Sequence, residues 1–281
     1  MEIAIVTSVW RFLVAFSGLA FFSAMEVSFQ FRKPLESRVK HYIRNLFLGL
    51  SNGLILHITI GGLIVAYYDV LAKHGIGVLN LLNLDSRTNI ILSLIFLDFI
   101  TYVWHRAYHE VPFLWRLHRV HHSDPDLDVT SASRFHISEV ALSSIFKMPA
   151  GVLWGPSAIA LAVHEAALGA AAQFHHANIR IPKPWESLIR RILVTPDMHH
   201  IHHTNKVVET NSNYSNLFSI WDKLFGTYTH LTEHEKIIYG LEEYPRLEEV
   251  SFKKLLLMPF GPHCGIGHNG KVTSILERMN K

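Results

Sequence analysis

The feature that most constrains the fold is a run of 23 residues, 46–68, that contains no formally charged side chain. A helix of this length is long enough to cross the hydrocarbon core of a bilayer, which is about 30 Å thick. The run therefore predicts a membrane-spanning helix, and the chain is expected to be an integral membrane protein.

Two further stretches extend this prediction. Residues 3–25 are apolar apart from Arg11, and they predict a membrane helix in which either the arginine reaches toward the interface or the helix is shifted along its axis. Residues 90–104 are too short to span a bilayer alone, so their helix is expected to continue out of the membrane through His105 and His109.

A helical hairpin is predicted over residues 140–172. Its two apolar halves, 140–154 and 158–172, are separated by Gly155-Pro156, a turn signal. The hairpin either dips part-way into the membrane or crosses it twice. Together these segments predict an all-α integral membrane protein with four to five hydrophobic helices. Its parts are N-terminal membrane helices (1–88), a core with the hairpin (89–230) and a C-terminal cytoplasmic tail (231–281).

Composition agrees with a membrane protein and argues against a nucleic-acid binder. Charged residues make up 17% of the chain, against about 25% in soluble proteins. The formal net charge of +3 is small, and no run of Lys and Arg suggests a phosphate-binding surface. The single cysteine, Cys264, excludes an internal disulfide and a cysteine-based metal site.

The distribution of basic residues predicts the orientation in the membrane. The loop between the first two predicted helices contains five Lys or Arg residues between Arg32 and Arg44, whereas residues 72–88 contain only Lys73 and Arg87. The positive-inside rule places the first loop, and with it both histidine-rich regions, in the cytoplasm. Residues 182–192 predict a short amphipathic helix on the membrane surface.

Histidines are concentrated in three clusters with helical spacing. One cluster has the pattern HxxxH and two have the pattern HxxHH; their members are His105, His109, His118, His121, His122, His199, His202 and His203. Neutral imidazole binds iron, zinc, copper and nickel. Eight imidazoles exceed the three that one catalytic zinc uses. The Glu-x-x-His and His-Glu-x-x-His motifs are both missing. The clusters therefore predict a two-metal centre held by histidine, in a helical cap on the cytoplasmic side.

Several kinds of chemistry are compatible with such a centre. Oxidation of a lipid chain requires a metal–oxygen oxidant, because an unactivated C–H bond is inert to other reagents. A membrane zinc hydrolase would use one metal and a glutamate base, for which Glu110 and Glu165 are candidates. A metal transporter would place its ligands within the membrane spans, whereas these clusters follow the predicted helix ends.

The motifs between residues 94 and 228 resemble those of the fatty acid hydroxylase/sterol desaturase superfamily of membrane di-iron enzymes. They include "LWRLHRVHHSD", "TSASRFHISE", "QFHHANIRIP" and "TPDMHHIHHT". The resemblance implies two iron ions and molecular oxygen, which hydroxylate or desaturate a lipid such as a sterol or fatty acyl chain. It implies that all eight clustered histidines are ligands and adds His176 and His136 as candidates. His175 and His200 are expected to be neighbours of the ligands.

Three acidic residues are candidates for supporting the metal ligands. Asp98 lies in an apolar helix and is expected to accept a hydrogen bond either from a metal-bound imidazole or from Tyr102. Glu110 and Asp222 are similar candidates. No haem-binding or flavin-binding motif is recognisable in the chain, so a separate electron donor (a ferredoxin, flavodoxin or b-type cytochrome) is expected.

Overall fold

The computed structural model describes residues 2–82, 84–231 and 236–261, and within these ranges the chain is helical without β-strands. The all-α prediction is confirmed for this part of the chain. The longer helices are α1 (Glu2–Ser28), α2 (Arg38–Leu56), α3 (Gly62–Lys73), α5 (Ser86–Glu110), α7 (Ile137–Trp154) and α8 (Ala158–His176). The shorter α-helices are α4 (Val78–Leu81), α6 (Pro112–His122), α9 (Lys183–Ile189), α10 (Pro196–His202), α11 (Val207–Thr210), α12 (Ile220–Leu224) and α13 (Phe252–Leu257). The remaining helical turns are η1 (His57–Gly61), η2 (Val129–Ser133), η4 (Leu247–Val250) and η5 (Met258–Phe260).

Two of the described helices are long and apolar enough to cross a membrane, as judged by length and composition. They are Arg38–Tyr68, in which η1 joins α2 to α3, and Ser86–Glu110, which is α5. The first contains the uncharged run, and the second continues through His105 and His109 as expected. The total of four to five membrane helices and the cytoplasmic position of the cap stay predictions.

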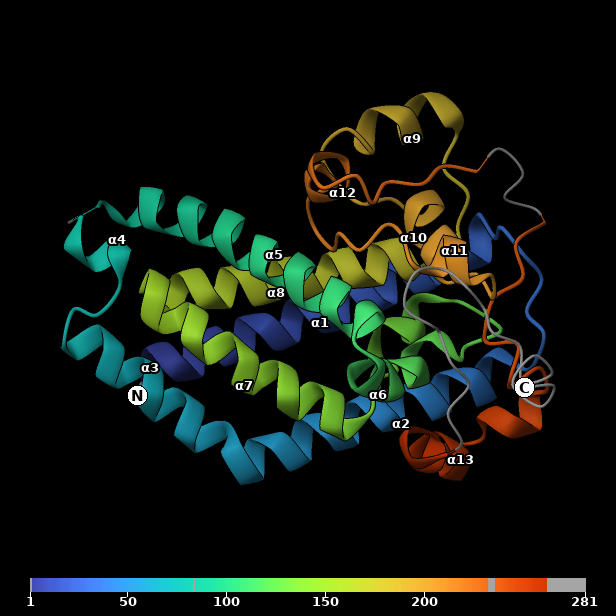
Figure 1. Cartoon of the computed structure of the whole chain (residues 1–281), viewed down its shortest axis with the longest axis horizontal. Helices are drawn as coiled ribbons and strands as arrows, with labels where there is room; N and C mark the ends of the chain where they lie inside the picture. Colours follow the sequence, from blue (N-terminus) through green and yellow to red (C-terminus); the bar gives the residue numbers. More distant parts are fainter. Residues whose placement is uncertain (1, 83, 232–235, 262–281) are drawn as a thin grey trace, which may run out of the picture.

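The long helices run along the long axis of the molecule (Figure 1). α8 packs against both α1 and α5, and its C-terminal end contacts α10. α7 ends at Gly155, which adopts a left-handed conformation with φ of 71°. A Cβ atom on Gly77 would lie 2.3 Å from the Gly155 nitrogen, so the loop before α4 packs directly on the hairpin turn.

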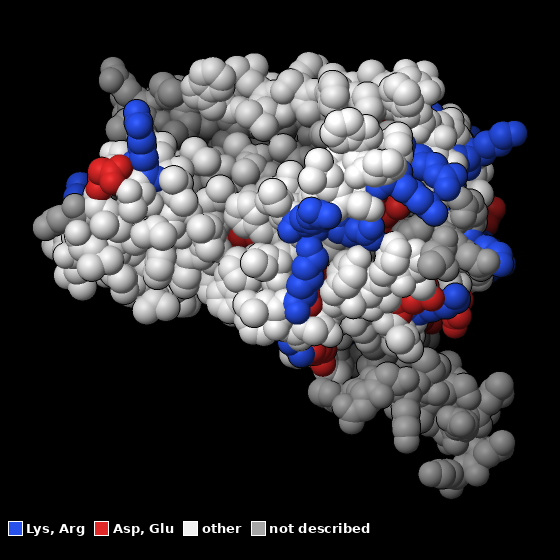
Figure 2. Space-filling model, turned by 90° about the horizontal axis from the view of Figure 1, so that it is seen from above, with Lys and Arg blue, Asp and Glu red and all other residues white. Residues whose placement is uncertain are grey.

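Charged and apolar surfaces occupy different parts of the molecule. Figure 2 shows a broad surface nearly free of Lys, Arg, Asp and Glu, while most charged side chains gather at the opposite end from α4. Leu50, Ile58 and Leu63 in the helix Arg38–Tyr68 are 70%, 71% and 69% exposed. Such an extensive apolar exterior is typical of a surface that contacts lipid rather than water.

A buried polar network fixes the loop that follows the first HxxHH cluster. His41 in α2 lies between two aspartates of this loop, with its Nε2 atom 2.9 Å from Asp124 and its Nδ1 atom 2.7 Å from Asp128. Arg134 hydrogen-bonds to Ser123 and to Asn45. Burial raises the pKa of Asp124, but the nearby charges of His41 and Arg134 lower this pKa by a larger amount. The net pKa is below the ordinary value, so the carboxyl group is ionised. The network attaches α2 to the segment immediately after His122.

Candidate metal centre

Nine buried histidines converge at the ends of four helices and form two groups. α5, α6, α8 and α10, with the residue after α10, supply all of them. The first group contains His105, His109, His118, His122 and His202. The second group contains His121, His176, His199 and His203. Within each group, the potential ligand atoms lie within 4.8 Å of one another.

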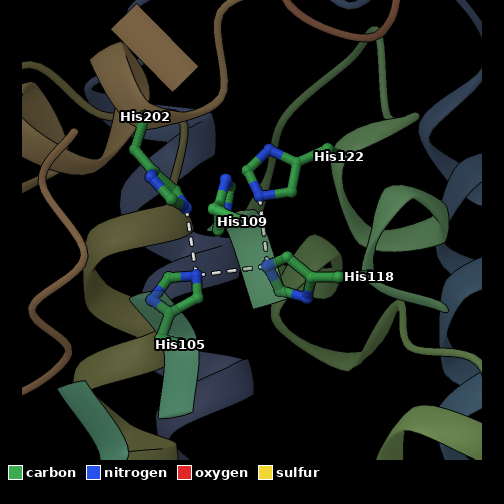
Figure 3. Close-up of side chains that lie close together, drawn as sticks. All are labelled: His105, His109, His118, His122 and His202. Atoms are coloured by element: carbon green, nitrogen blue, oxygen red, sulfur yellow. Dashed lines mark hydrogen bonds between the residues drawn. The ribbon is translucent and has the colours of Figure 1, made fainter. Parts of the chain in front are cut away.

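The Nε2 atoms of the five-histidine group face one another (Figure 3). The His105 Nε2 atom lies 3.1 Å from that of His118 and 3.1 Å from that of His202. The His118 and His122 Nε2 atoms are 3.2 Å apart. The Nε2 atom of His109 is buried and has no hydrogen-bond partner.

The opposite nitrogens determine which ring atoms carry hydrogen. The Nδ1 atom of His105 lies 2.8 Å from the Tyr214 carbonyl oxygen, and that of His202 lies 2.7 Å from the Ser212 carbonyl oxygen. Because a carbonyl can only accept, both Nδ1 atoms must be donors. A neutral imidazole has only one N–H group, so the Nε2 atoms of His105 and His202 both present bare lone pairs.

Two lone pairs at 3.1 Å repel each other unless a cation lies between them. Imidazole nitrogens bind a metal such as zinc at about 2.1 Å, so two neighbouring ligands are separated by about 3.0 Å at a right angle and about 3.4 Å at the tetrahedral angle. The observed 3.1 Å between the Nε2 atoms of His105 and His202 lies between these two separations. We therefore interpret these contacts as edges of a metal coordination shell rather than as hydrogen bonds.

The four-histidine group has the same character. Successive Nε2 atoms are separated by 3.1 Å from His121 to His176, by 3.1 Å from His176 to His199, and by 3.0 Å from His199 to His203. His176 donates from Nδ1 to the Ala172 carbonyl oxygen at 2.7 Å, so its Nε2 atom is also a bare acceptor. The nine side chains therefore fit two metal ions, with five and four imidazoles respectively.

Burial keeps these imidazoles neutral, as metal ligation requires. Burial lowers the pKa of His118 to about 3. Burial, reinforced by neighbouring histidines, also lowers the pKa of His121, His122, His199 and His203 well below the ordinary value. Mutual hydrogen bonding between protonated and neutral rings is therefore not what holds the groups together near neutral pH.

Glu139 is a supporting residue that the sequence did not single out. Its Oε1 atom lies 2.6 Å from the Nδ1 atom of His118, and its side chain is buried at the start of α7. A carboxyl group at this position orients the imidazole. Burial raises the pKa of Glu139 well above its ordinary value, so the charged form that makes the imidazole a stronger ligand requires a cation at the site. The only hint in the sequence was its place in the motif "TSASRFHISE".

The three predicted acidic residues lie around the site without touching the Nε2 clusters. Asp98 accepts hydrogen bonds from the backbone of Leu217 and Phe218 and from the indole of Trp221, rather than from an imidazole or Tyr102. Asp222 accepts from the Tyr214 and Ser215 backbone amides and from Thr227. Glu110 forms a surface ion pair with Arg106 at 2.6 Å.

His136, His175 and His200, which the motifs suggested as ligands or as their neighbours, lie outside both groups. His136 is at the N-terminus of α7, where its Nδ1 atom accepts from the Ser138 amide and its Nε2 atom lies 3.3 Å from the Leu256 carbonyl oxygen. The structure therefore does not bring it together with the other nine. His200 hydrogen-bonds to the Tyr239 hydroxyl, and the His175 ring packs against that of His199 at a tilted angle, with 3.9 Å between centroids.

Residues 90–227 match the sequence model of the fatty acid hydroxylase family. Alkylglycerol monooxygenase from Homo sapiens is 36% identical over 146 residues, which cover 51% of this chain and 31% of that protein. Ornithine lipid hydroxylase OlsE from Rhizobium tropici is 32% identical over 144 residues, covering 50% and 41%. Fatty acid hydroxylase vlmA from Lecanicillium sp is 34% identical over 149 residues, covering 47% and 40%.

These alignments span less than half the length of each of the three relatives. No solved structure matches the chain. The region matched by the family model contains all nine histidines of the two groups. The resemblance drawn from the motifs is thereby confirmed, and residues 90–227 of the chain match the fatty acid hydroxylase family.

Proposed function

We propose that this protein is a non-haem di-iron oxidoreductase that uses molecular oxygen to hydroxylate a membrane lipid. The observation that carries the proposal is the pair of buried histidine groups, whose neighbouring Nε2 atoms lie 3.0–3.2 Å apart. His105, His109, His118, His122 and His202 would hold one iron, and His121, His176, His199 and His203 the other. Bound iron would supply the oxygen chemistry that breaks an unactivated C–H bond.

Relatives favour hydroxylation over desaturation and a lipid over a soluble substrate. Three relatives are named as an alkylglycerol monooxygenase, an ornithine lipid hydroxylase and a fatty acid hydroxylase. These names share a long hydrocarbon chain or a lipid as the substrate and the addition of oxygen as the reaction. A fatty acyl or alkyl chain is therefore our first candidate, with a sterol as a further one.

The protein's own residues would exclude water and hold the ligands in place. All nine histidines are at most 8% exposed. The carbonyl groups of Ser212 and Tyr214 and the carboxylate of Glu139 fix three of the rings from behind. Because α5 combines a candidate membrane span with His105 and His109, a lipid chain could reach the site from the bilayer without crossing water.

The site is proposed to lie on the cytoplasmic side of a multi-pass membrane protein. The basic loop between α1 and α2 supports this orientation through the positive-inside rule. A separate ferredoxin, flavodoxin or b-type cytochrome would deliver electrons there. A zinc hydrolase is less well supported, because Glu110, a candidate base, is engaged in the exposed ion pair with Arg106.

Metal analysis of the purified chain tests the proposed centre. Two irons per chain are expected, whereas a single zinc would favour the hydrolase. Lipid extracts from cells with and without the protein should differ by products that have gained one oxygen atom, and labelled dioxygen should supply that atom. Loss of two hydrogens instead would indicate desaturation.

Single ligand substitutions sharpen this test. His121→Ala removes a ligand of the four-histidine group and His202→Ala one of the five-histidine group, so each should abolish the product. His57→Ala changes an exposed histidine outside both groups and should leave the product level unchanged. Normal product from either ligand variant would contradict the assignment.

A further inference from the structure

Two short helices that are distant in sequence form a single apolar surface beside the metal centre. Trp185 and Leu188 in α9 are exposed, and so is Ile192 shortly after this helix. α12 and its C-terminal neighbour expose Leu224 and Phe225 to 66% and 45%, and Ile220 is also exposed. We call residues 182–193 and 218–228 together the α9–α12 lobe; it projects from the helical body in Figure 1.

Backbone contacts make the lobe one unit. The Ser219 amide donates to the Ile192 carbonyl oxygen at 3.0 Å, and the ammonium group of Lys223 donates to the Arg190 carbonyl oxygen at 2.8 Å. The Ser219 hydroxyl donates to the same carbonyl at 2.7 Å. The exposed apolar side chains of α9 and α12 are therefore held together rather than presented by independent loops.

The charge on the accessible part of the lobe is positive. Lys183, Arg191 and Lys223 are exposed. Glu186 and Asp222 are the only acidic residues in its two segments, and both are buried. Figure 2 shows basic side chains around apolar surface on the side of the molecule from which the lobe projects. Apolar residues with a basic border are typical of a surface that inserts among anionic lipid headgroups.

The lobe is also continuous with a candidate membrane span. The ring of Phe225 stacks on Phe99 and Tyr102 of α5, with centroids 5.7 Å and 5.4 Å apart. Farther along α5, Ile91 and Ile95 are exposed and extend the apolar surface. A bilayer that surrounds α5 would therefore lie against the lobe as well.

We propose that the α9–α12 lobe docks on the same bilayer that α5 enters, with its apolar side chains in the interface and its basic residues among anionic headgroups. The segment between α11 and α12 carries the Ser212 and Tyr214 carbonyls that orient His202 and His105. Docking of the lobe would thus hold the metal centre at the membrane surface. This inference concerns location and does not depend on the identity of the metal or product.

Site-specific fluorescence on the full-length chain tests this docking. In a Cys264→Ser background, Leu188→Cys places one label on the lobe, and Val208→Cys places a control label at an exposed valine of α11. The labelled proteins are reconstituted into vesicles of phosphatidylcholine and phosphatidylglycerol in a two-to-one ratio. Quenching is measured with nitroxide-bearing lipids and with iodide present on both sides of the membrane.

The label at 188 is expected to be quenched by the nitroxide lipids and shielded from iodide, and the label at 208 is expected to show the reverse. Adding Lys183→Glu and Arg191→Glu should weaken docking at least tenfold, because each basic residue contributes about fivefold near an anionic surface. Equal iodide access at 188 and 208 would overturn the proposal. Shielding from iodide without quenching by the nitroxide lipids would also overturn the proposal, because it would indicate that protein covers the label. Quenching by the nitroxide lipids that does not change with the charge reversals would overturn it as well.

Discussion

The position of the ring hydrogen decides whether each histidine in the centre can act as a ligand. His105, His176 and His202 donate from Nδ1 to main-chain carbonyls, which leaves their Nε2 atoms free to bind metal. His118 differs, because its Nδ1 atom faces a side-chain carboxylate at 2.6 Å. Burial raises the pKa of this carboxyl group, whereas a metal bound to His118 would favour its charged form, which increases the basicity of the ligand as well as fixing the ring.

Replacing Glu139 with glutamine should therefore weaken metal binding without emptying the core. Glu139→Gln keeps the size and a hydrogen-bond acceptor but cannot ionise beside a metal-bound His118, so iron affinity should fall by about 10- to 100-fold. Iron retained during competition with a chelator measures this change. Glu248→Gln, at an exposed glutamate in η4, is the matched control. Equal iron retention in both variants would contradict the role of Glu139.

Much of the ligand set could be proposed from the sequence because helical spacing is local. Histidines three and four residues apart must share a face, as His118, His121 and His122 do. The partners of Asp98 and His118 could not be obtained in this way. Asp98 contacts residues 119 to 123 positions away, and Glu139 reaches His118 across 21 positions. Such pairs depend on tertiary packing, about which periodicity carries no information.

Among the structural elements, the segment between α11 and α12 has the most direct control over the five-histidine group. Its main-chain carbonyls at Ser212 and Tyr214 hold His202 and His105. Asp222 in turn fixes the segment by accepting from the Tyr214 and Ser215 amides at 2.8 Å and 3.0 Å. The position of the histidines in the five-histidine group therefore depends on the Asp222 carboxylate, which does not touch them.

Removing the Asp222 carboxylate should consequently weaken metal binding by the five-histidine group more than by the four-histidine group. Asp222→Ala leaves two buried amides without their acceptor, at a cost of about 1–3 kcal/mol for each. The iron content should fall from two toward one per chain, since within the described residues no histidine of the four-histidine group donates a hydrogen bond to this segment's carbonyls. Elemental analysis and the thermal midpoint measure the two effects.

The control for this variant is Asp85→Ala at the start of α5. Asp85 also accepts from two backbone amides, those of Arg87 and Thr88, but at the N-terminal end of the helix. Its loss should reduce stability by about 1 kcal/mol and leave both irons in place. Equal loss of iron from the two variants would show that the Asp222 effect is general destabilisation rather than positioning.

For the whole molecule, the two histidine groups are a source of instability unless they are filled. α5, α6, α8 and α10, with the residue after α10, bring nine buried, uncharged rings together, and the bare Nε2 atoms of His105 and His202 face each other at 3.1 Å. Local sequence signals account for the separate helices, but their convergence depends on contacts between α8 and both α5 and α10. Metal ions would convert this repulsion into a link among four helices.

Metal removal should therefore lower the stability of the whole chain. Ligand present at about a thousandfold excess over its dissociation constant contributes about 4 kcal/mol, which corresponds to a fall in thermal midpoint of roughly 10 °C. Refilling with zinc should restore the midpoint, because zinc also binds imidazole, yet it should not restore oxygen incorporation, because zinc has no redox chemistry. The exposed-site variant His57→Ala should show the same shift on chelation, whereas His121→Ala should show a smaller one. A midpoint that is indifferent to chelation in the wild-type chain would mean that packing alone holds the histidines together, and the metal centre would lose its main physical support.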